Sequence, residues 1–138
     1  MAEPKTRPTD IPLDSFLAEL PEAQRDDART LAGLMQSVTG EPPVVWGGNI
    51  VGFGRYAQRY ADGRQLPWPL LGFSPRGEEL SLYLMDGFAE RQALLAGLGR
   101  HRTGRSCLYI RRLSDVSPAV LRQLLEASVE ALAPLRIR

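Results

Sequence analysis

The sequence predicts an α+β domain of two layers, in which helices pack on one face of a mainly antiparallel sheet. Apolar residues recur at helical spacing near both ends of the chain, whereas residues 44–85 are rich in aliphatic and aromatic strand formers. The spacers between these strands are short, and short spacers favour antiparallel pairing because a parallel pair needs a longer crossover. No internal repeat is visible, so a single two-layer domain accounts for the chain.

The N-terminal part is predicted to be an arm followed by two helices. Residues 1–12 carry Pro4, Pro8 and Pro12 without an apolar period, so we expect them to be disordered or loosely docked, and the domain to span residues 13–138. A short helix is expected before Pro21. A second helix is expected over residues 22–38, with Gly40 and the two following prolines ending it.

The remaining elements follow from the change to strand-like periodicity. We expect strands over residues 44–46, 50–60, 70–74 and 80–85, a helix over residues 88–98, and a last strand over residues 106–110. Ser117 is a predicted N-cap with Pro118 at the first helical position, so the final helix should begin there.

Alternation along the strands predicts which residues face the helices. Leu80, Leu82 and Leu84 should do so, as should Leu108 and Ile110. The residues between them then form a second, aromatic and polar face. If helices cover one side only, this second face is a candidate binding surface.

Composition and charge limit the classes of function. The chain is 43% hydrophobic and 24% charged, which is typical of a globular domain with a packed core. Its net charge of +1 gives little support to nucleic-acid binding. The single cysteine and the absence of a signal-peptide pattern predict a cytoplasmic protein. No apolar run is long enough to cross a membrane, so we expect no membrane partner.

Glycines interrupt the second predicted strand at Gly52 and Gly54, which should lie on one face. Glycine within a strand marks a bulge, a close approach of another chain segment, or room for a ligand. Tight packing is the favoured interpretation here, because glycine has many steric roles.

An arginine-rich loop lies at residues 99–106. Its sequence, GRHRTGRS, fits the phosphate-loop pattern except that arginine replaces lysine. The predicted order here is helix, loop and strand, whereas phosphate loops run from a strand into a helix, so we reject that interpretation. Two interpretations stay open: solvated arginines in a turn, and an anion-recognition loop of another kind.

Several segments resemble a known family. They are WGGNIVGFGRY (46–56), GFSPR (72–76), LYLMDGF (82–88) and GRHRTGRSCLYIRRLSDV (99–116), and they resemble the YdhG-like family of bacterial domains of unknown function. The resemblance covers about residues 14–132. It implies an α+β fold similar to frataxin, and an iron-chaperone role has been proposed for members of the family.

Three hypotheses for function follow. The first is a non-enzymatic domain that binds a small anionic or aromatic molecule at an Arg/Tyr/Trp-lined surface. Catalysis is disfavoured because no third group is identifiable to orient His101 against Cys107 or Ser106. The candidate ligand-binding residues are Trp46, Arg55, Tyr56, Tyr60, Trp68, Arg76, His101, Arg105 and Tyr109. We expect five of them to share one concavity beside the sheet: Trp46, Arg55, Arg76, His101 and Tyr109.

The second hypothesis is a frataxin-like iron-binding protein that uses acids of the first two helices. Its candidate ligands are Asp14, Glu19, Glu22, Asp26 and Asp27. His101 and Cys107 alone are too few for a zinc site. The third hypothesis is nucleic-acid binding on the second sheet face, where aromatic side chains could stack bases and arginines could neutralise phosphates. The oligomeric state does not follow from the sequence, and no cofactor other than iron is implied.

Overall fold

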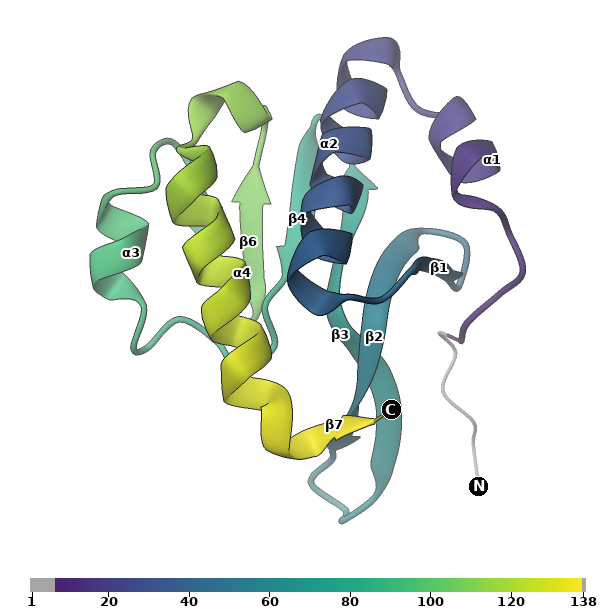
Figure 1. The fold of residues 1–138 in the computed structure, drawn as a ribbon, viewed down its shortest axis with the longest axis vertical. Helices are drawn as coiled ribbons and strands as arrows, with labels where there is room; N and C mark the ends of the chain where they lie inside the picture. Colours follow the sequence, from purple (N-terminus) through teal and green to yellow (C-terminus); the bar gives the residue numbers. More distant parts are fainter. Residues whose placement is uncertain (1–6, 138) are drawn as a thin grey trace.

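The computed structural model describes residues 7–137. Helices and strands follow one another in an order that confirms the predicted α+β class (Figure 1). In chain order the elements are α1 (Leu13–Ala18), α2 (Glu22–Thr39), β1 (Pro43–Trp46), β2 (Ile50–Arg59), β3 (Gln65–Arg76), β4 (Glu79–Tyr83), α3 (Gln92–Ala96), β5 (Arg102–Thr103), β6 (Cys107–Ile110), the 3₁₀ helix η1 (Leu113–Asp115), α4 (Pro118–Leu132), the 3₁₀ helix η2 (Ala133–Leu135) and β7 (Arg136–Ile137).

The strands form one antiparallel sheet in the order β1-β2-β3-β4-β6-β5. The last strand, β7, also pairs with β2. β1 pairs with residues 50–53 of β2, and β7 pairs with Arg55 and Tyr56. Along one edge of β2, the partner strand therefore changes from β1 to β7 near Gly54. Gly54 itself is paired with no residue of β1, β3 or β7.

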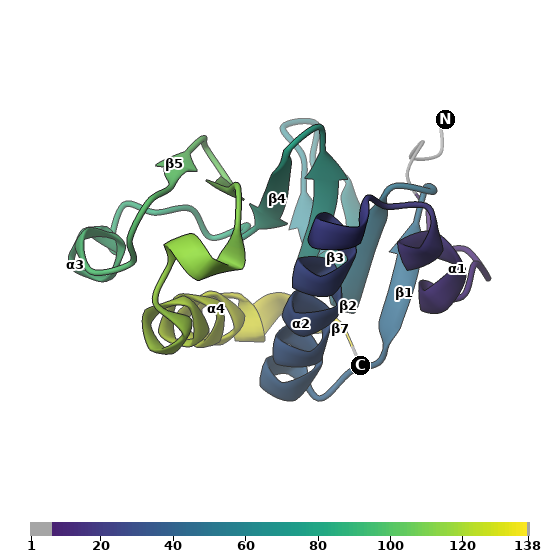
Figure 2. The ribbon, with the colours of Figure 1, turned by 90° about the horizontal axis from the view of Figure 1, so that it is seen from above.

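The helices pack on one face of the sheet, as predicted. Figure 2 shows α2 and α4 on the same side of the strands. The main core lies between these layers and takes apolar side chains from all four α-helices. Leu80, Leu82 and Leu84 belong to this core, as do Leu108 and Ile110, so the predicted inward faces of β4 and β6 are confirmed.

Two predicted helix ends are confirmed by their cap geometry. Gly40 follows α2 with a φ of 73°, a left-handed conformation that glycine adopts without a steric penalty. Ser117 precedes α4, and its side-chain oxygen accepts a hydrogen bond from the Val120 amide at 3.3 Å. Pro118 occupies the first turn, where its missing N–H costs nothing.

The prediction of a helix over residues 88–98 was wrong in its length. Only Gln92–Ala96 is helical, and Phe88 lies in a turn. Gly87 has a φ of 80°, and Asp86 and Arg91 form an ion pair of 3.1 Å across the turn. These contacts hold the segment in turn geometry, although its apolar residues still reach the core.

The third strand begins earlier than predicted. The prolines in its first half obscured the strand pattern in the sequence. β3 begins at Gln65, and Pro67 and Pro69 pair with Ala57 and Arg55 of β2. The register with β4 begins only at Gly72, so this stretch of β3 has no strand on its other side. A proline is tolerated there because no ladder partner needs its missing N–H.

Part of the predicted N-terminal arm lies along the edge of β1. The Thr9 amide donates to the Val45 carbonyl at 2.9 Å, and the Gly47 amide donates to the Arg7 carbonyl at 2.8 Å. Pro8 and Trp46 form an antiparallel bridge between these two bonds. Residues 1–6 of the predicted arm lie outside the described residues.

Candidate functional site

The sheet face turned away from the helices carries a packed aromatic cluster, formed by Trp46, Trp68 and Tyr83. Ring centroids of Trp46 and Trp68 lie 6.3 Å apart, and those of Trp68 and Tyr83 lie 6.4 Å apart in an edge-to-face arrangement. Trp46 is 2% exposed and Tyr83 is 8% exposed. The aromatic centre of this face is therefore filled by its own side chains, and these two rings offer no open platform for stacking bases.

Glycines in the underlying strands make room for this cluster. Gly52 and Gly72 lie opposite each other in the β2–β3 register. A Cβ atom at Gly52 would lie 2.8 Å from Trp46 Nε1 and 2.9 Å from the Pro69 ring. The space above Gly52 is thus occupied by Trp46 and Pro69, which agrees with the packing interpretation of this glycine.

The prediction that five residues share one concavity was wrong. Trp46 and Arg55 line one groove, His101 and Tyr109 line a different concavity, and Arg76 lines neither of them. The strand order explains the separation. β1 and β6 are four strand steps apart, or about 19 Å at the usual strand spacing.

The other candidate ligand residues have separate surroundings. Tyr56 is buried against Leu70 and Leu132, and Trp68 belongs to the aromatic cluster. Tyr60 is half-buried near the β2–β3 turn, where the Arg64 guanidinium carbon lies 5.4 Å from its ring centroid. Arg105 is exposed before β6. The structure brings none of these four into the groove or the concavity.

The basic concavity is a hollow lined mainly by charged side chains. It encloses about 250 Å³ at the β5–β6 end of the sheet. Its lining comes from β4, the loop before β5, β5 itself, and β6 with the residue after it. The lining residues are Glu79, Arg100, His101, Arg102, Tyr109 and Arg111.

Arg102 is held in place on two sides. Its guanidinium carbon lies 4.1 Å from the Tyr109 ring centroid, a cation–π contact. Its Nε donates to Glu79 Oε2 at 3.2 Å, and its Nη2 donates to the other oxygen of the same carboxylate. The hydrogen bond with Glu79 raises the pKa of Arg102, which stays fully charged. Arg102 is thus oriented before any ligand arrives.

The other two arginines of the concavity differ in their partners. Arg111 Nη2 donates to Glu78 Oε2 at 2.9 Å, between exposed side chains that gain little from pairing. Within residues 7–137, no hydrogen bond or ion pair engages the side chain of Arg100. Arg100 is therefore the guanidinium of the basic concavity with all its side-chain donors available.

The backbone fixes the tautomer of His101. Its Nδ1 lies 2.8 Å from the Gly99 carbonyl oxygen, which can only accept a hydrogen bond. Nδ1 must then carry the proton. Nε2 is left as an acceptor in neutral His101 and becomes a donor when the ring is charged.

Arg76 lies next to this end of the sheet, opposite Glu79 in the β3–β4 register. Interaction with the Tyr83 hydroxyl raises the pKa of Arg76, and Cys107 and Tyr109 add to the effect. Arg76 is exposed, so its positive charge strengthens the field around the basic concavity without lining it.

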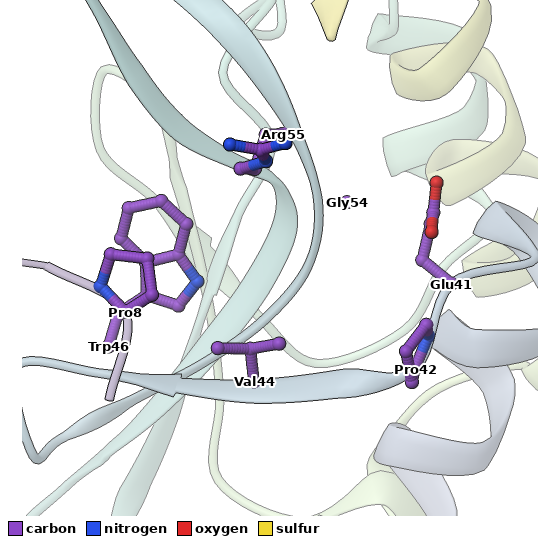
Figure 3. Close-up of a pocket in the computed structure, with 7 residues that line it drawn as sticks. All are labelled: Pro8, Glu41, Pro42, Val44, Trp46, Gly54 and Arg55. Carbon is purple, nitrogen blue, oxygen red and sulfur yellow. The ribbon is translucent and has the colours of Figure 1, made fainter. Parts of the chain in front are cut away.

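A second hollow, the Trp46–Arg55 groove, lies where β2 changes partner (Figure 3). It encloses about 300 Å³ and differs from the basic concavity in having mostly apolar walls. Glu41 stands at one side and forms an ion pair of 3.2 Å with Arg136. The lining residues are Pro8, Glu41, Pro42, Val44, Trp46, Gly54 and Arg55.

The acids proposed as iron ligands do not form a cluster. Within residues 7–137, no three His, Cys, Asp or Glu side chains lie close enough together to hold a metal ion. Asp27 is engaged elsewhere: it accepts from Arg112 Nε at 2.8 Å and from the Leu113 amide at 3.2 Å. The remaining candidates are exposed on or beside α1 and α2: Asp14, Glu19, Glu22 and Asp26.

Sequence reasoning missed several lining residues. The arginine-rich loop had indicated an anion-recognition segment, and Arg100 and Arg102 belong to it, but the candidate set did not include them. Glu79 and Arg111 join the concavity through pairing of β4 with β6. Glu79 and Arg111 could have been predicted from the alternation of side chains along these strands, because it places both residues on the sheet face turned away from the helices.

Compared with models of protein families, with curated proteins and with solved structures, the chain matches none of them. The YdhG-like resemblance and the frataxin-like description of the fold therefore stay predictions. None of the helices in residues 7–137 combines the length and the apolar character that a membrane crossing requires.

The burial of Tyr56 gives a test of the small core near the chain's C-terminal strand. Burial, with a smaller effect from Tyr60, raises the pKa of Tyr56 to about 12. An unfolded tyrosine ionises near pH 10. The neutral hydroxyl is therefore favoured in the folded state, and its contribution to stability is present below about pH 10 and lost as the pH rises toward 12.

As the pH rises over this range, the free energy of unfolding of the natural chain should fall by about 1–2 kcal/mol more than that of Tyr56→Phe. This figure allows for the partial solvation of Tyr56. Urea unfolding of both proteins at pH 9.5 and 11.5 measures this difference. The other tyrosines are common to both proteins and cancel. Parallel pH profiles would show that Tyr56 ionises as it does in water.

Proposed function

We propose that the chain is a binding domain for a small, multiply charged anion, with phosphate groups as the favoured chemistry, in the basic concavity. The observation that carries the proposal is the unengaged Arg100 guanidinium, which lies among oriented cationic side chains. Arginine matches phosphate and carboxylate oxygens through paired N–H donors. A hollow where guanidinium groups outnumber lining carboxylates attracts such an anion.

The contacts described above suggest a role for each residue. Arg100 would bind the anion directly. Arg102, fixed between Tyr109 and Glu79, would offer the donors that Glu79 leaves unused. His101 would add a donor from Nε2 when its ring is charged, because Nδ1 is engaged by Gly99. Arg76 and Arg111 would supply longer-range attraction.

The chemistry of the lining supports binding without covalent catalysis. Arginine does not exchange its proton at neutral pH. The neighbouring Cys107 raises the pKa of Tyr109, so this hydroxyl keeps its proton at neutral pH. Cys107 is a free thiol, which suits a reducing compartment such as the cytoplasm. Among the lining side chains, the Glu79 carboxylate is engaged by Arg102, and the side chain of His101 has the Gly99 carbonyl as its hydrogen-bond partner.

Arg100→Gln should weaken phosphate binding about tenfold or more, because a charge-assisted hydrogen bond is lost. Binding is measured as the rise in Tm with increasing sodium phosphate, compared with sodium chloride at the same ionic strength. Arg29→Gln is the matched control, since Arg29 is exposed on α2 and does not line the concavity.

The control separates a specific site from general attraction. Equal weakening by Arg100→Gln and Arg29→Gln would mean that phosphate responds only to net charge, and the proposal would fail. It would also fail if phosphate, pyrophosphate and citrate all left Tm unchanged at millimolar concentration. Pyrophosphate should stabilise more than phosphate, because several guanidinium groups can share its charge.

A further inference from the structure

We infer that the Trp46–Arg55 groove is a second, independent binding site, and that it accepts a small monocarboxylate with an aliphatic or aromatic body. The groove lies at the opposite end of the strand order from the basic concavity. Its lining combines one cation with apolar side chains, whereas the basic concavity offers several cations. The two hollows therefore select different anions.

The balance of charge in the groove defines the head group of the ligand. Glu41 is compensated by Arg136, whose Nη2 lies 3.2 Å from Glu41 Oε2 and also donates to the Thr39 carbonyl at 2.7 Å. The Arg136 side chain is 10% exposed and that of Glu41 is 33% exposed, so the pair is partly shielded from water. Within residues 7–137, no hydrogen bond or ion pair engages the exposed Arg55 side chain. One positive charge is thus left to meet one carboxylate.

The walls define the body of the ligand. Pro8, Pro42 and Val44 present apolar surface, and the aromatic Trp46 also lines the groove. Figure 3 shows Arg55 and Glu41 on either side of Gly54, with Val44 and Trp46 bordering the same space. A volume of about 300 Å³ is at the lower end of the range for small-molecule sites. The groove therefore suits a compact acid with one ring or a short branched chain.

The backbone explains why a hollow forms at this point. β1 is paired with β2 as far as Phe53, and β7 is paired with it from Arg55. Gly54 lies between these pairings and has a φ of 69°. A Cβ atom at Gly54 would lie 3.2 Å from Glu41 Cγ and 3.4 Å from Leu70. The glycine thus keeps the floor of the groove free of a side chain between its acidic and basic sides.

The test uses phenylacetate as the probe and phenylacetamide as its uncharged counterpart. Isothermal titration calorimetry of the full chain should show phenylacetate binding, and phenylacetamide should bind at least about tenfold more weakly. In a Trp68→Phe background, Trp46 is the sole tryptophan, so its fluorescence should change with the same dissociation constant. No binding of phenylacetate at 10 mM, or equal binding of the amide, would overturn the inference.

Two charge variants locate the site. Arg55→Gln should weaken phenylacetate binding about tenfold or more. Arg59→Gln is the matched control, because Arg59 is an exposed arginine on the same strand that does not line the groove. If Arg59→Gln weakens binding as much as Arg55→Gln does, the site is not this groove.

The same variants keep this inference separate from the proposed phosphate site. Arg55→Gln should leave stabilisation by phosphate unchanged, and Arg100→Gln should leave phenylacetate binding unchanged. Loss of phenylacetate binding in Arg100→Gln would place the carboxylate in the basic concavity and overturn the second site. If the natural chain bound phenylacetate but not phosphate, only the proposed function would be contradicted.

Discussion

Gly99→Ala is expected to lower the free energy of unfolding by about 3–5 kcal/mol, through steric overlap and backbone strain. Gly99 has a φ of 119°, which residues with a side chain rarely adopt. A Cβ atom there would overlap the Asp115 carbonyl oxygen and lie 3.1 Å from Val116 Cα. Both obstacles are backbone atoms, so no side-chain rotation relieves them.

The position matters because Gly99 connects the arginine-rich loop, through backbone contacts, to the residues that precede α4. Gly99 forms a bridge with Val116, the Arg100 amide donates to the Asp115 carbonyl at 3.1 Å, and the Ser117 amide donates to the Leu98 carbonyl at 2.7 Å. Displacing Gly99 would disturb all three contacts. Thermal unfolding should show Tm lowered by about 10–15 °C.

Gly97→Ala is the matched control for this glycine. Its φ is −97°, and an added Cβ atom would meet nothing closer than the Leu94 carbonyl oxygen at 3.8 Å. We expect a change in Tm of only a few degrees. If Gly99→Ala were as stable as Gly97→Ala, the close approach of residues 99 and 115 would be disproved.

Phe73→Ala is expected to cost about 3–5 kcal/mol, because it leaves a cavity at the centre of the main core. Phe73 is fully buried and pairs with Val51 on one side and Leu82 on the other. Its side chain points to the helices, whereas that of the next residue points to the aromatic face. Urea unfolding with a common slope measures the loss of stability.

Ser74→Ala tests the opposite face of the same strand. Ser74 is equally buried, and its Oγ lies 3.4 Å from the Tyr83 hydroxyl, a long contact. Removing this oxygen should cost only about 1 kcal/mol. Losses of equal size for Phe73→Ala and Ser74→Ala would contradict the assignment of these two faces.

Local patterns in the sequence predicted the elements that depend on neighbouring residues. The alternation of Leu80, Leu82 and Leu84 gave the correct inward face of β4, and Ser117 with Pro118 gave the start of α4. Two strands were missed, β5 and β7, because two residues are too few to show a period. The prolines of β3 concealed the first half of that strand.

The candidate site was harder to predict because it depends on strand order. The loop sequence indicated that an arginine cluster lies near His101, and the structure places Tyr109 and Arg102 beside it. The separation of Trp46 from Tyr109 results from the placement of β2, β3 and β4 between their strands. That order is set by contacts between distant residues, which spacing along the chain does not reveal.

The two outer strands of the strand order, β1 and β5, affect how readily the chain could aggregate. An exposed, unpaired edge strand is a template on which another chain can add a strand. At one edge, β1 has four residues, begins with a proline, and is partly covered by residues 7–9. At the other edge, β5 has two residues, and one of them is the charged Arg102. We therefore expect these two edges to resist intermolecular strand addition at high concentration.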